Sequence, residues 1–468
     1  MRFVYCLFIF LASFNILAQT DTTGKNIFTL KDLYNQMLKN HPLVKATDYL
    51  PRIAQEEIRI ARGNFDPKIE VDYAQKTLKD KFYYSYWDSR LKAPIWIGEL
   101  KAGYELNEGA LLGEDEKTPQ QGLMYAGISI PLGQNLLIDA RRATLRQAQI
   151  AQQIASAERI KILNKLFYSA SKDYWEWFFT YNELTFIQKG YQLAEERYKF
   201  IKQRISFGES PGIDSVEAKI TLQERTIQLK QAEVDFKNAT LVLSNYLWLE
   251  SQPVELPENA IPQSLDVAEV LTEARLNQLL AFAQENHPEL QKIRFKITQL
   301  EIERKFQRDR LKPRINLNYN LLAGYNPSKF EVSGDYFANN YKIGLDVSFP
   351  ILLRKERGKV FQTNFKLDQN RLDQSQTARE INTEIKATYN ETLLLQRNIT
   401  LQQDIVKNQE VLRNAEYQRF TNGESSVFLI NARESKLIDL QIKLVSLQSK
   451  YEKSKVMLRW AAGERFWE

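Results

Sequence analysis

Residues able to carry catalytic or metal chemistry are scarce in this chain. It has two histidines, His41 and His287, and each lies in an Asn-His-Pro tripeptide, far from the other in sequence. The sequence contains no nucleophile elbow, no phosphate-binding loop and no clustered metal ligands. We therefore expect no enzyme activity, no cofactor and no metal site. The histidines are interpreted as structural, because the proline alone explains the start of a helix.

Residues 1–18 have the pattern of a secretory signal peptide. Arg2 gives a positive start, an apolar core follows, and Ala18 is a small residue at a plausible cleavage point. A transmembrane anchor is the alternative, but the stretch is short and polar residues interrupt it. The only cysteine, Cys6, lies within this signal, so the mature chain has no disulfide and no thiolate site.

The charge balance argues against a nucleic-acid partner. The chain has 64 basic and 58 acidic residues, a formal charge of +6, which is mild for 468 residues. No stretch after the signal reaches 18 consecutive apolar residues. A membrane crossing by this chain would therefore require a β-barrel.

An internal repeat organises the sequence. The shift of 246 residues from His41 to His287 also relates Pro67 to Pro313, Ile69 to Ile315 and Tyr73 to Tyr319. Two later signatures recur in the same order: 127–131 resembles 344–350, and 207–210 resembles 422–425. We predict a first structural repeat at 19–252, a linker at 253–264 with three prolines, and a second repeat at 265–468.

Each half predicts a helix, then β-strands, then a long helical hairpin. Apolar residues alternate with polar ones at 69–73 and again at 315–319, the period of a strand with one apolar face. Strands are also expected at 94–106, 123–131 and 341–350. The segment 68–93 adds strand-like material beyond one hairpin. Whether it extends the sheet or folds over it stays open.

The helical hairpins are unusually long. Residues 139–206 contain no proline, and residues 359–421 contain neither proline nor glycine. At 1.5 Å per residue, 60 helical residues make a rod of about 90 Å. A seven-residue step on the returning helices predicts coiled-coil packing. It runs through Ile213, Ile220, Ile227, Val234, Leu241 and Trp248, and through Ile430, Leu437, Leu444, Tyr451 and Leu458.

The turn motifs carry a family resemblance. Phe207-Gly208 is followed by 213–218 (Ile-Asp-Ser-Val-Glu-Ala), and Phe420-x-Asn-Gly423 is followed by 429–432 (Leu-Ile-Asn-Ala). With the duplicated order of elements, these motifs resemble the TolC family of outer-membrane channels over nearly all of 28–462. The resemblance implies an α+β membrane protein. Its long helical hairpins would form an α-barrel, and four transmembrane strands per chain would join a trimeric, twelve-stranded β-barrel.

The resemblance also implies a location, partners and a functional tip. The location is the outer membrane of a Gram-negative bacterium, in contact with its lipid and with a long periplasmic extension. The expected partners are two further copies in a homotrimer, a periplasmic adaptor and an inner-membrane transporter. The turns would form the periplasmic gate and adaptor contact, through Gly208, Glu209, Asp214, Gly423, Glu424 and Asn431. Asn431 stands where many members have aspartate, which weakens a second acidic ring.

The function expected from these features is the exit duct of an efflux pump or a type I secretion system. A periplasmic coiled-coil adaptor is one alternative, although adaptors usually carry a single hairpin. A structural coiled coil is another, although it would not explain the alternating strands. The cargo, the class of transporter and the resting state of the gate do not follow from the sequence.

Overall fold

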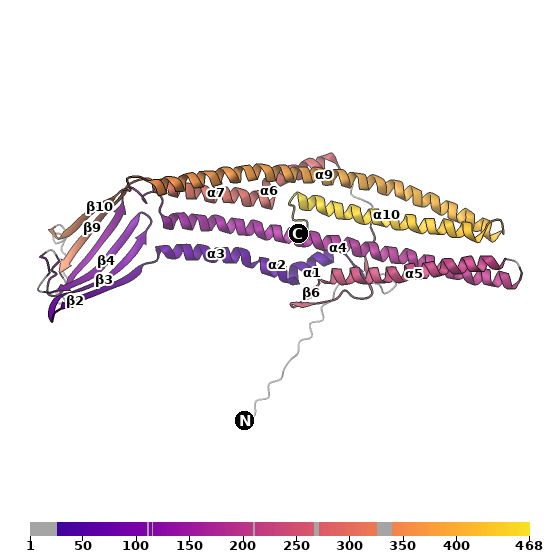
Figure 1. Cartoon of the computed structure of the whole chain (residues 1–468), viewed down its shortest axis with the longest axis horizontal. Helices are drawn as coiled ribbons and strands as arrows, with labels where there is room; N and C mark the ends of the chain where they lie inside the picture. The colour runs from indigo at the N-terminus through magenta and orange to yellow at the C-terminus, as the bar shows by residue number, and fades with distance from the viewer. Residues whose placement is uncertain (1–25, 110–111, 115, 209–210, 266–270, 325–338) are drawn as a thin grey trace, which may run out of the picture. The chain divides into compact units, whose positions relative to one another are not determined.

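The computed structural model describes residues 26–109, 112–114, 116–208, 211–265, 271–324 and 339–468 (Figure 1). The chain divides into two compact units. Unit 1 comprises the residues up to Thr47, Ile162–Gln284 and Ile381–Glu468, and unit 2 comprises Asp48–Lys161 and Glu285–Glu380. Each unit takes segments from both halves of the repeat, so neither coincides with one predicted repeat.

Helices make up most of the chain, and their order is the same in both halves. The first half has α1 (Leu30–Asn40), α2 (Pro42–Thr47), α3 (Tyr49–Arg62), α4 (Ala140–Ser206) and α5 (Gly212–Ser244). The second has α6 (Glu273–Asn286), α7 (Pro288–Asp309), α9 (Arg354–Thr421) and α10 (Val427–Ala461). Among the described helices, none combines the length and apolar character needed to cross a membrane.

The two long helices agree with the sequence prediction. α4 has 67 residues and α9 has 68, without interruption. The one glycine in the predicted stretch, Gly190 of α4, lies where α10 approaches closely. A Cβ atom there would come 2.5 Å from the Ile438 side chain. This glycine therefore permits tight helix packing and does not break the helix.

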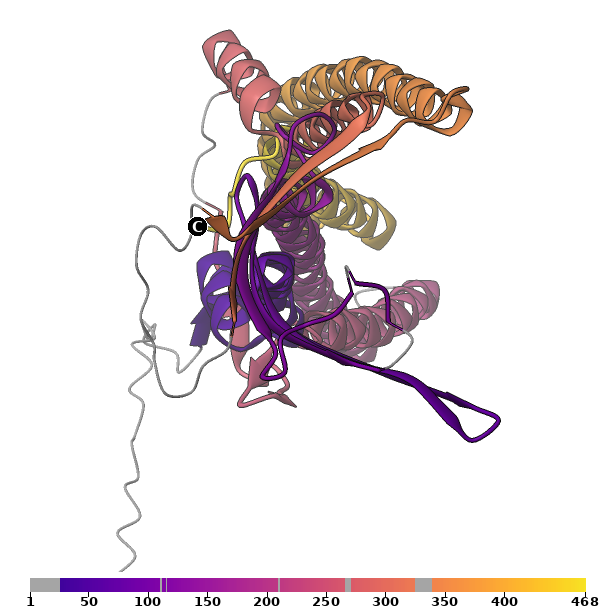
Figure 2. The ribbon, with the colours of Figure 1, turned by 90° about the vertical axis from the view of Figure 1, so that its left-hand side faces the viewer.

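Unit 2 contains one antiparallel sheet of six strands in the order β10-β9-β5-β4-β3-β2. Its strands are β2 (Lys68–Leu78), β3 (Lys81–Ile95), β4 (Gly98–Glu108), β5 (Leu123–Pro131), β9 (Arg314–Gly324) and β10 (Tyr341–Ser348). Seen nearly end-on, the strands form a single curved layer (Figure 2). The edges of this layer are β10 and β2.

The sheet has six described strands, two more than the four transmembrane strands expected per chain. The segment 68–93 forms β2 and most of β3, and both strands extend the sheet. The turn between them is Lys79-Asp80, two residues with positive φ (51° and 58°) and no glycine or asparagine to mark it in the sequence. The single strand expected at 94–106 is divided between two strands, because the chain turns between Ile95, the end of β3, and Gly98, the start of β4.

The core of unit 1 is aromatic. Trp177, Tyr174 and Phe167 of α4 are almost completely buried, and they pack against α1 and the C-terminal Trp467. Tyr34 of α1 and Phe167 meet edge to face at 5.3 Å. This cluster holds the start of the chain, the middle of α4 and the C-terminus in one body.

The predicted linker has structure of its own. β1 (Asn26–Phe28) pairs in parallel with β8 (Ala260–Pro262), which lies within 253–264. A second small ladder joins β6 (Trp248–Leu249) to β7 (Gln252–Pro253). The connection between the repeats therefore supports unit 1 through backbone hydrogen bonds.

The seven-residue stripes of the two returning helices differ in burial. On α10, Ile430, Leu437, Tyr451 and Leu458 are buried, as coiled-coil packing requires. On α5 the corresponding stripe is exposed along its length, at Ile213, Ile220, Ile227, Val234 and Leu241. Packing within one chain therefore explains only one of the two stripes.

The Asn-His-Pro tripeptides are helix starts in both halves. The Nδ1 atom of His287 accepts a hydrogen bond from the Glu289 amide (3.2 Å), and the Nδ1 atom of His41 accepts one from the Leu43 amide (3.1 Å). In each case proline occupies the first helical position. Each histidine thus caps a helix with a neutral ring, which accounts for the tripeptide in physical terms.

Burial lowers the pKa of His287 from 6.5 to about 4 and also lowers that of His41. For His287, the Glu289 carboxylate opposes this effect and Lys161 adds to it. Because the folded pKa lies below the unfolded one, the unfolded chain binds more protons between pH 6.5 and about 4. The free energy of unfolding contributed by the cap is therefore present near pH 7 and is lost as the pH falls through this window.

We predict that replacing both histidines by asparagine removes part of this pH dependence. Asparagine is a good helix cap whose acceptor does not titrate in this range. The heat-denaturation midpoint in detergent should fall less between pH 7 and pH 4.5 in the His41→Asn/His287→Asn variant than in the parent. As a control, His287→Ala should lose about 1 kcal/mol at pH 7. An equal fall in parent and asparagine variant would contradict the neutral-cap explanation.

Candidate functional site

The sheet of unit 2 has two faces of opposite character. Residues paired across the strands share a face, so the register assigns the paired side chains to a face, up to the register shift after Lys76 of β2. We define the apolar face as the one that carries Ile69 of β2, Leu91 of β3, Ala102 of β4, Ala126 of β5, Leu321 of β9 and Tyr341 of β10. Across the paired positions its only charged residue is Glu108, at the end of β4.

The opposite, polar face carries the charges. Arg90 of β3 binds Glu70 of β2 at 3.1 Å, and it also contacts Asp72 and Asp88. Lys92 binds the same Glu70 at 2.7 Å. These pairs join β2 to β3 on one side of the sheet. A face with paired charges suits water, and a charge-free face suits hydrocarbon, as in the wall of a transmembrane barrel.

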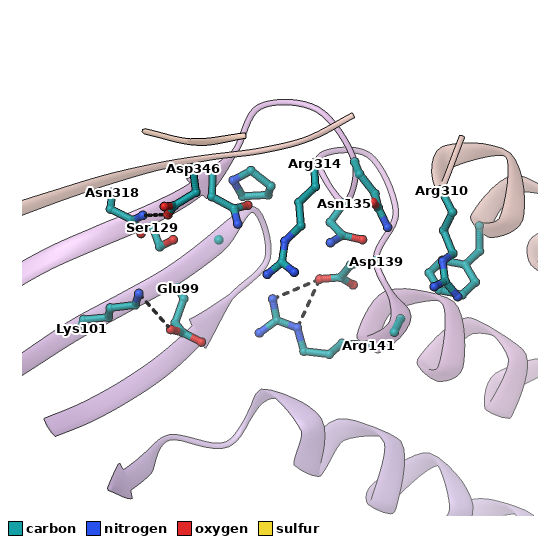
Figure 3. A pocket seen from close by; sticks show the side chains of 16 residues that line it. Glu99, Lys101, Ser129, Asn135, Asp139, Arg141, Arg310, Arg314, Asn318 and Asp346 are labelled. Atoms are coloured by element: carbon teal, nitrogen blue, oxygen red, sulfur yellow. Dashed lines mark hydrogen bonds and ion pairs between the residues drawn. The ribbon is translucent and has the colours of Figure 1, made fainter. Parts of the chain in front are cut away.

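A hollow of about 660 Å³ lies where the polar face meets the helices of unit 2 (Figure 3). Its lining includes Lys101 and Glu99 of β4, Arg314 of β9, Asp346 of β10 and Arg141 of α4. Asp346 accepts a hydrogen bond from Asn318, and Lys101 lies 3.7 Å from Glu99. Basic and acidic groups alternate around the hollow, so it is hydrated and does not favour ions of one sign.

Beside this hollow, the segment between β5 and α4 is hydrogen-bonded to the end of α7, which precedes β9. Asp139 caps α4 by accepting from the Arg142 amide at 2.8 Å, and it pairs with the guanidinium groups of Arg141 and Arg142. Asp309 of α7 accepts from the Asn135 amide at 2.6 Å. Asp139 and Asp309 are both buried, so losing either would leave donors unsatisfied.

The described residues show no grouping of three or more histidine, cysteine or acidic side chains able to hold a metal ion. The hollow has open, polar walls and lacks the apolar lining typical of a site for a small organic ligand. Its arrangement fits passage of water and solutes along the polar face better than retention of a ligand.

The second candidate site is the pair of helix turns in unit 1. Gly208 follows α4 with φ of 76°, and Gly423 follows α9 with φ of 79°. At the second turn the Gly423 amide donates to Phe420 O and the Glu424 amide to Arg419 O, which closes the helix with a left-handed glycine. A Cβ atom at either glycine would meet nothing within 4 Å. The glycines are therefore required by backbone conformation and not by space.

The acidic residues expected at these turns have different surroundings. Glu209 lies outside the described residues. Asp214 lies within the first turn of α5, whose cap position is Pro211, so it does not cap this helix. Glu424 is exposed, while Ser426 supplies the cap of α10 by accepting from the Leu429 amide. Around both turns, apolar side chains are exposed, and Phe207 reaches 78%.

Asn431 lies between the two hairpins, in a buried polar cluster. Its Oδ1 atom accepts from Arg197 of α4 at 2.6 Å, and its amide nitrogen donates to Thr221 of α5 at 3.1 Å. Arg197 also pairs with Glu434 at 2.6 Å, and both of these side chains are less than 10% exposed. A small apolar cluster next to it includes Ile201, Phe420 and Ile430. The hairpin ends of both halves are thus joined by a desolvated ion pair.

Sequence reasoning found the turn residues but missed Arg197, Glu434 and Asp139. Charged residues are frequent throughout the long helices, so nothing in their spacing distinguishes a buried arginine from a solvated one. Asp139 could have been identified from the sequence, since an aspartate directly before a long proline-free stretch is a typical helix cap.

Comparison with known proteins gives a family match for part of the chain. Residues 279–464 match the family model described as outer membrane efflux protein. No curated protein matches the chain in sequence.

Solved structures match nearly the whole chain in fold. The CmeC outer membrane channel of Campylobacter jejuni is 13% identical, with a TM-score of 0.64 over 93% of this chain and 85% of its own. The outer membrane protein VceC of Vibrio cholerae is 15% identical, with a TM-score of 0.63 over 93% and 96%. The open state of the MtrE outer membrane channel of Neisseria gonorrhoeae is 12% identical, with a TM-score of 0.65 over 93% and 89%.

The fold is that of a TolC-like outer-membrane channel, which confirms the predicted fold class. The family match covers residues 279–464, and the rest of the chain is similar to these channels in fold alone. The matching model describes outer membrane efflux proteins and the similar structures are outer membrane channels, which agrees with the predicted location in the outer membrane. The adaptor and the structural coiled coil, the two alternatives from the sequence, do not agree with this family.

The buried ion pair at the hairpin ends yields a stability prediction. Removing one partner of a desolvated pair leaves the other charge buried, which costs about 3 kcal/mol or more. Arg197→Met should therefore destabilise the hairpin ends by about this amount, whereas Glu434→Gln also leaves a charge buried but keeps an acceptor for Arg197 and should cost less. Hydrogen exchange of α4 and α10 near these residues measures both effects.

The matched control is the double variant Arg197→Met/Glu434→Leu, which removes both charges and should recover most of the lost protection. If Arg197→Met alone leaves exchange near Ile201 and Ile430 unchanged, the ion pair does not hold the hairpin ends together.

Proposed function

We propose that the protein is the passive exit duct of an export machine: a homotrimer that conducts solutes across the outer membrane. The observation that carries the proposal is the two-faced sheet, with all charges at the paired positions except that of Glu108 on one face. An apolar face in contact with lipid and a polar face in contact with water are what a conducting wall requires. Catalysis is not part of this function.

A trimer is supported by surfaces that one chain leaves open. The exposed stripe of α5 has a counterpart on α9, where Leu394, Leu401, Ile405 and Leu412 are also exposed. Seven-residue spacing suits packing between helices of neighbouring chains. A sheet with two free edges also cannot lie in a bilayer without partners for its backbone groups.

The finer assignment is an efflux pump or a type I secretion system, with a periplasmic adaptor and an inner-membrane transporter as partners. Exposed apolar residues around both helix turns support a protein contact there, among them Phe207, Ile213 and Phe428. We assign the turns with Gly208, Glu209, Asp214, Gly423, Glu424 and Asn431 to the periplasmic gate and the adaptor contact.

The exposed α5 stripe gives a test of the trimer. A lysine at Ile227 would place a charge in an interface between chains, but at an exposed position within each chain. We predict that Ile227→Lys lowers the temperature at which the detergent-solubilised trimer dissociates, while the helical circular dichroism is unchanged. The matched control is Lys219→Glu, a charge change at an exposed position of α5 outside the stripe. A parent protein that is a stable monomer in mild detergent would reject the proposal.

Acidic residues at the turns give a test of conduction. Three chains would bring three copies of Asp214 and of Glu424 to one mouth, where like charges attract cations and repel anions. We predict a small, cation-preferring conductance in planar bilayers. Asp214→Asn/Glu424→Gln should move the reversal potential under a salt gradient towards zero. A protein that never conducts contradicts the duct, whereas an unchanged reversal potential contradicts only the acidic mouth.

A further inference from the structure

The sheet of unit 2 contains two strands that have no counterpart among the described residues of the second repeat. β2 and β9 are counterparts, because each follows a helix and the shift of 246 residues relates Pro67 to Pro313 and Tyr73 to Tyr319. β5 and β10 are counterparts too, since each leads into a long helix, α4 or α9. β3 and β4 have no counterpart in the described part of the second repeat, so we treat them as a hairpin inserted into the first repeat.

The inserted strands are integral parts of the sheet. β3 pairs with β4 from Ser85 to Ile95, and β4 pairs with β5 from Glu99 to Glu105. β2 pairs with β3 along its full length, from Lys68 to Leu78. The hairpin therefore separates β2 from β5 by two fully hydrogen-bonded strands.

The two-faced pattern continues through the insertion. On β3, Trp87, Leu91 and Ile95 share the apolar face with Ile69 and Tyr73 of β2. On the polar side, Arg90 and Lys92 pair with the carboxylate of Glu70. Ile69 is 79% exposed, and Trp87 and Leu91 are more than 40% exposed, so none of the described chain covers this part of the apolar face. A hairpin folded over the sheet in water would not need such a face.

The two edge strands, β10 and β2, run in directions that allow them to pair between neighbouring chains. All neighbouring strands are antiparallel, and the number of strands is even, so β10 of one chain and β2 of the next would also run antiparallel. The repeat supplies an internal precedent. The pairing of β5 with β9 joins the last strand of the first repeat to the first strand of the second. Its equivalent between chains joins β10 to β2.

We infer that each chain contributes all six strands to the wall, and that β2 pairs with β10 of the neighbouring copy. The inference rests on the proposed trimer. Three chains then close a wall of eighteen strands, six from each, instead of the twelve expected from the family resemblance. Because barrel diameter grows roughly linearly with strand number, the lumen at this level would be about one and a half times as wide.

The precedent also predicts the register. In the β5–β9 pair, Ile128 lies opposite Tyr319. The repeat maps Tyr319 onto Tyr73. It maps Ile128 onto Leu345 when the glycines of the two strand signatures are aligned, and onto Val347 when their prolines are aligned. All these positions lie on the apolar face. Tyr73 of one chain should therefore lie opposite Leu345 or Val347 of the next.

The register can be tested by disulfide cross-linking of the full-length protein in its membrane. The only native cysteine is in the predicted signal, so the background is clean. Tyr73→Cys/Leu345→Cys or Tyr73→Cys/Val347→Cys should give a covalent trimer after oxidation, on a denaturing gel without reductant. The matched control, Asp72→Cys/Leu345→Cys, places the thiols on opposite faces and should give little product.

The competing arrangement has β10 of one chain paired with β4 of the next and the β2–β3 hairpin outside the wall. In that case Leu100→Cys/Leu345→Cys or Ala102→Cys/Leu345→Cys cross-links, and the six-strand inference is overturned while the trimeric duct stands. Absence of any product between chains in all of these variants would overturn the inference and the trimer together.

Single cysteines give a measurement that does not depend on bond geometry. In intact outer membranes, a membrane-impermeant maleimide should label Asp72→Cys at least tenfold faster than Val71→Cys or Leu91→Cys, because lipid covers the apolar face. Equal labelling of these positions would place the β2–β3 hairpin in water and overturn the inference.

Discussion

The structure depends on one constraint: backbone amide and carbonyl groups in a bilayer must be hydrogen-bonded within protein. The sheet satisfies this requirement for its inner strands through continuous antiparallel ladders, but β2 and β10 each leave a row of groups unpaired. The charge distribution on the sheet, the exposed stripes of α5 and α9 and the open edges are all consistent with a chain that is complete only in an assembly.

Much of the fold could be predicted from sequence because the patterns are long. A stretch without proline that exceeds 60 residues admits few structures, and α4 and α9 agree with it. The repeated tripeptide around His41 and His287 likewise fixed two helix starts. The number of strands could not be predicted, because the Lys79-Asp80 turn uses left-handed conformations in residues that rarely signal them. Turn chemistry, and not hydrophobic period, left the role of the segment 68–93 open.

The candidate sites were predictable only where the backbone requires a residue type. Gly208 and Gly423 were found because a left-handed helix end favours glycine. Asn431 was noticed as a departure from a family pattern, but its contacts with Arg197 and Thr221 depend on helix packing that no single sequence reveals. The difference in burial between the stripes of α5 and α10 has the same origin, since identical periodicity serves contacts within a chain and between chains.

In the proposed wall of eighteen strands, the inserted hairpin also explains how such an architecture can change in size. A strand reverses the direction of the chain, so one added strand would deliver α4 to the wrong side of the membrane. Two added strands return the chain to the same side, and the junction around Asp139 is left as it was. The hairpin is therefore the smallest increment by which this architecture can grow, and insertions of odd strand number should be absent among its variants.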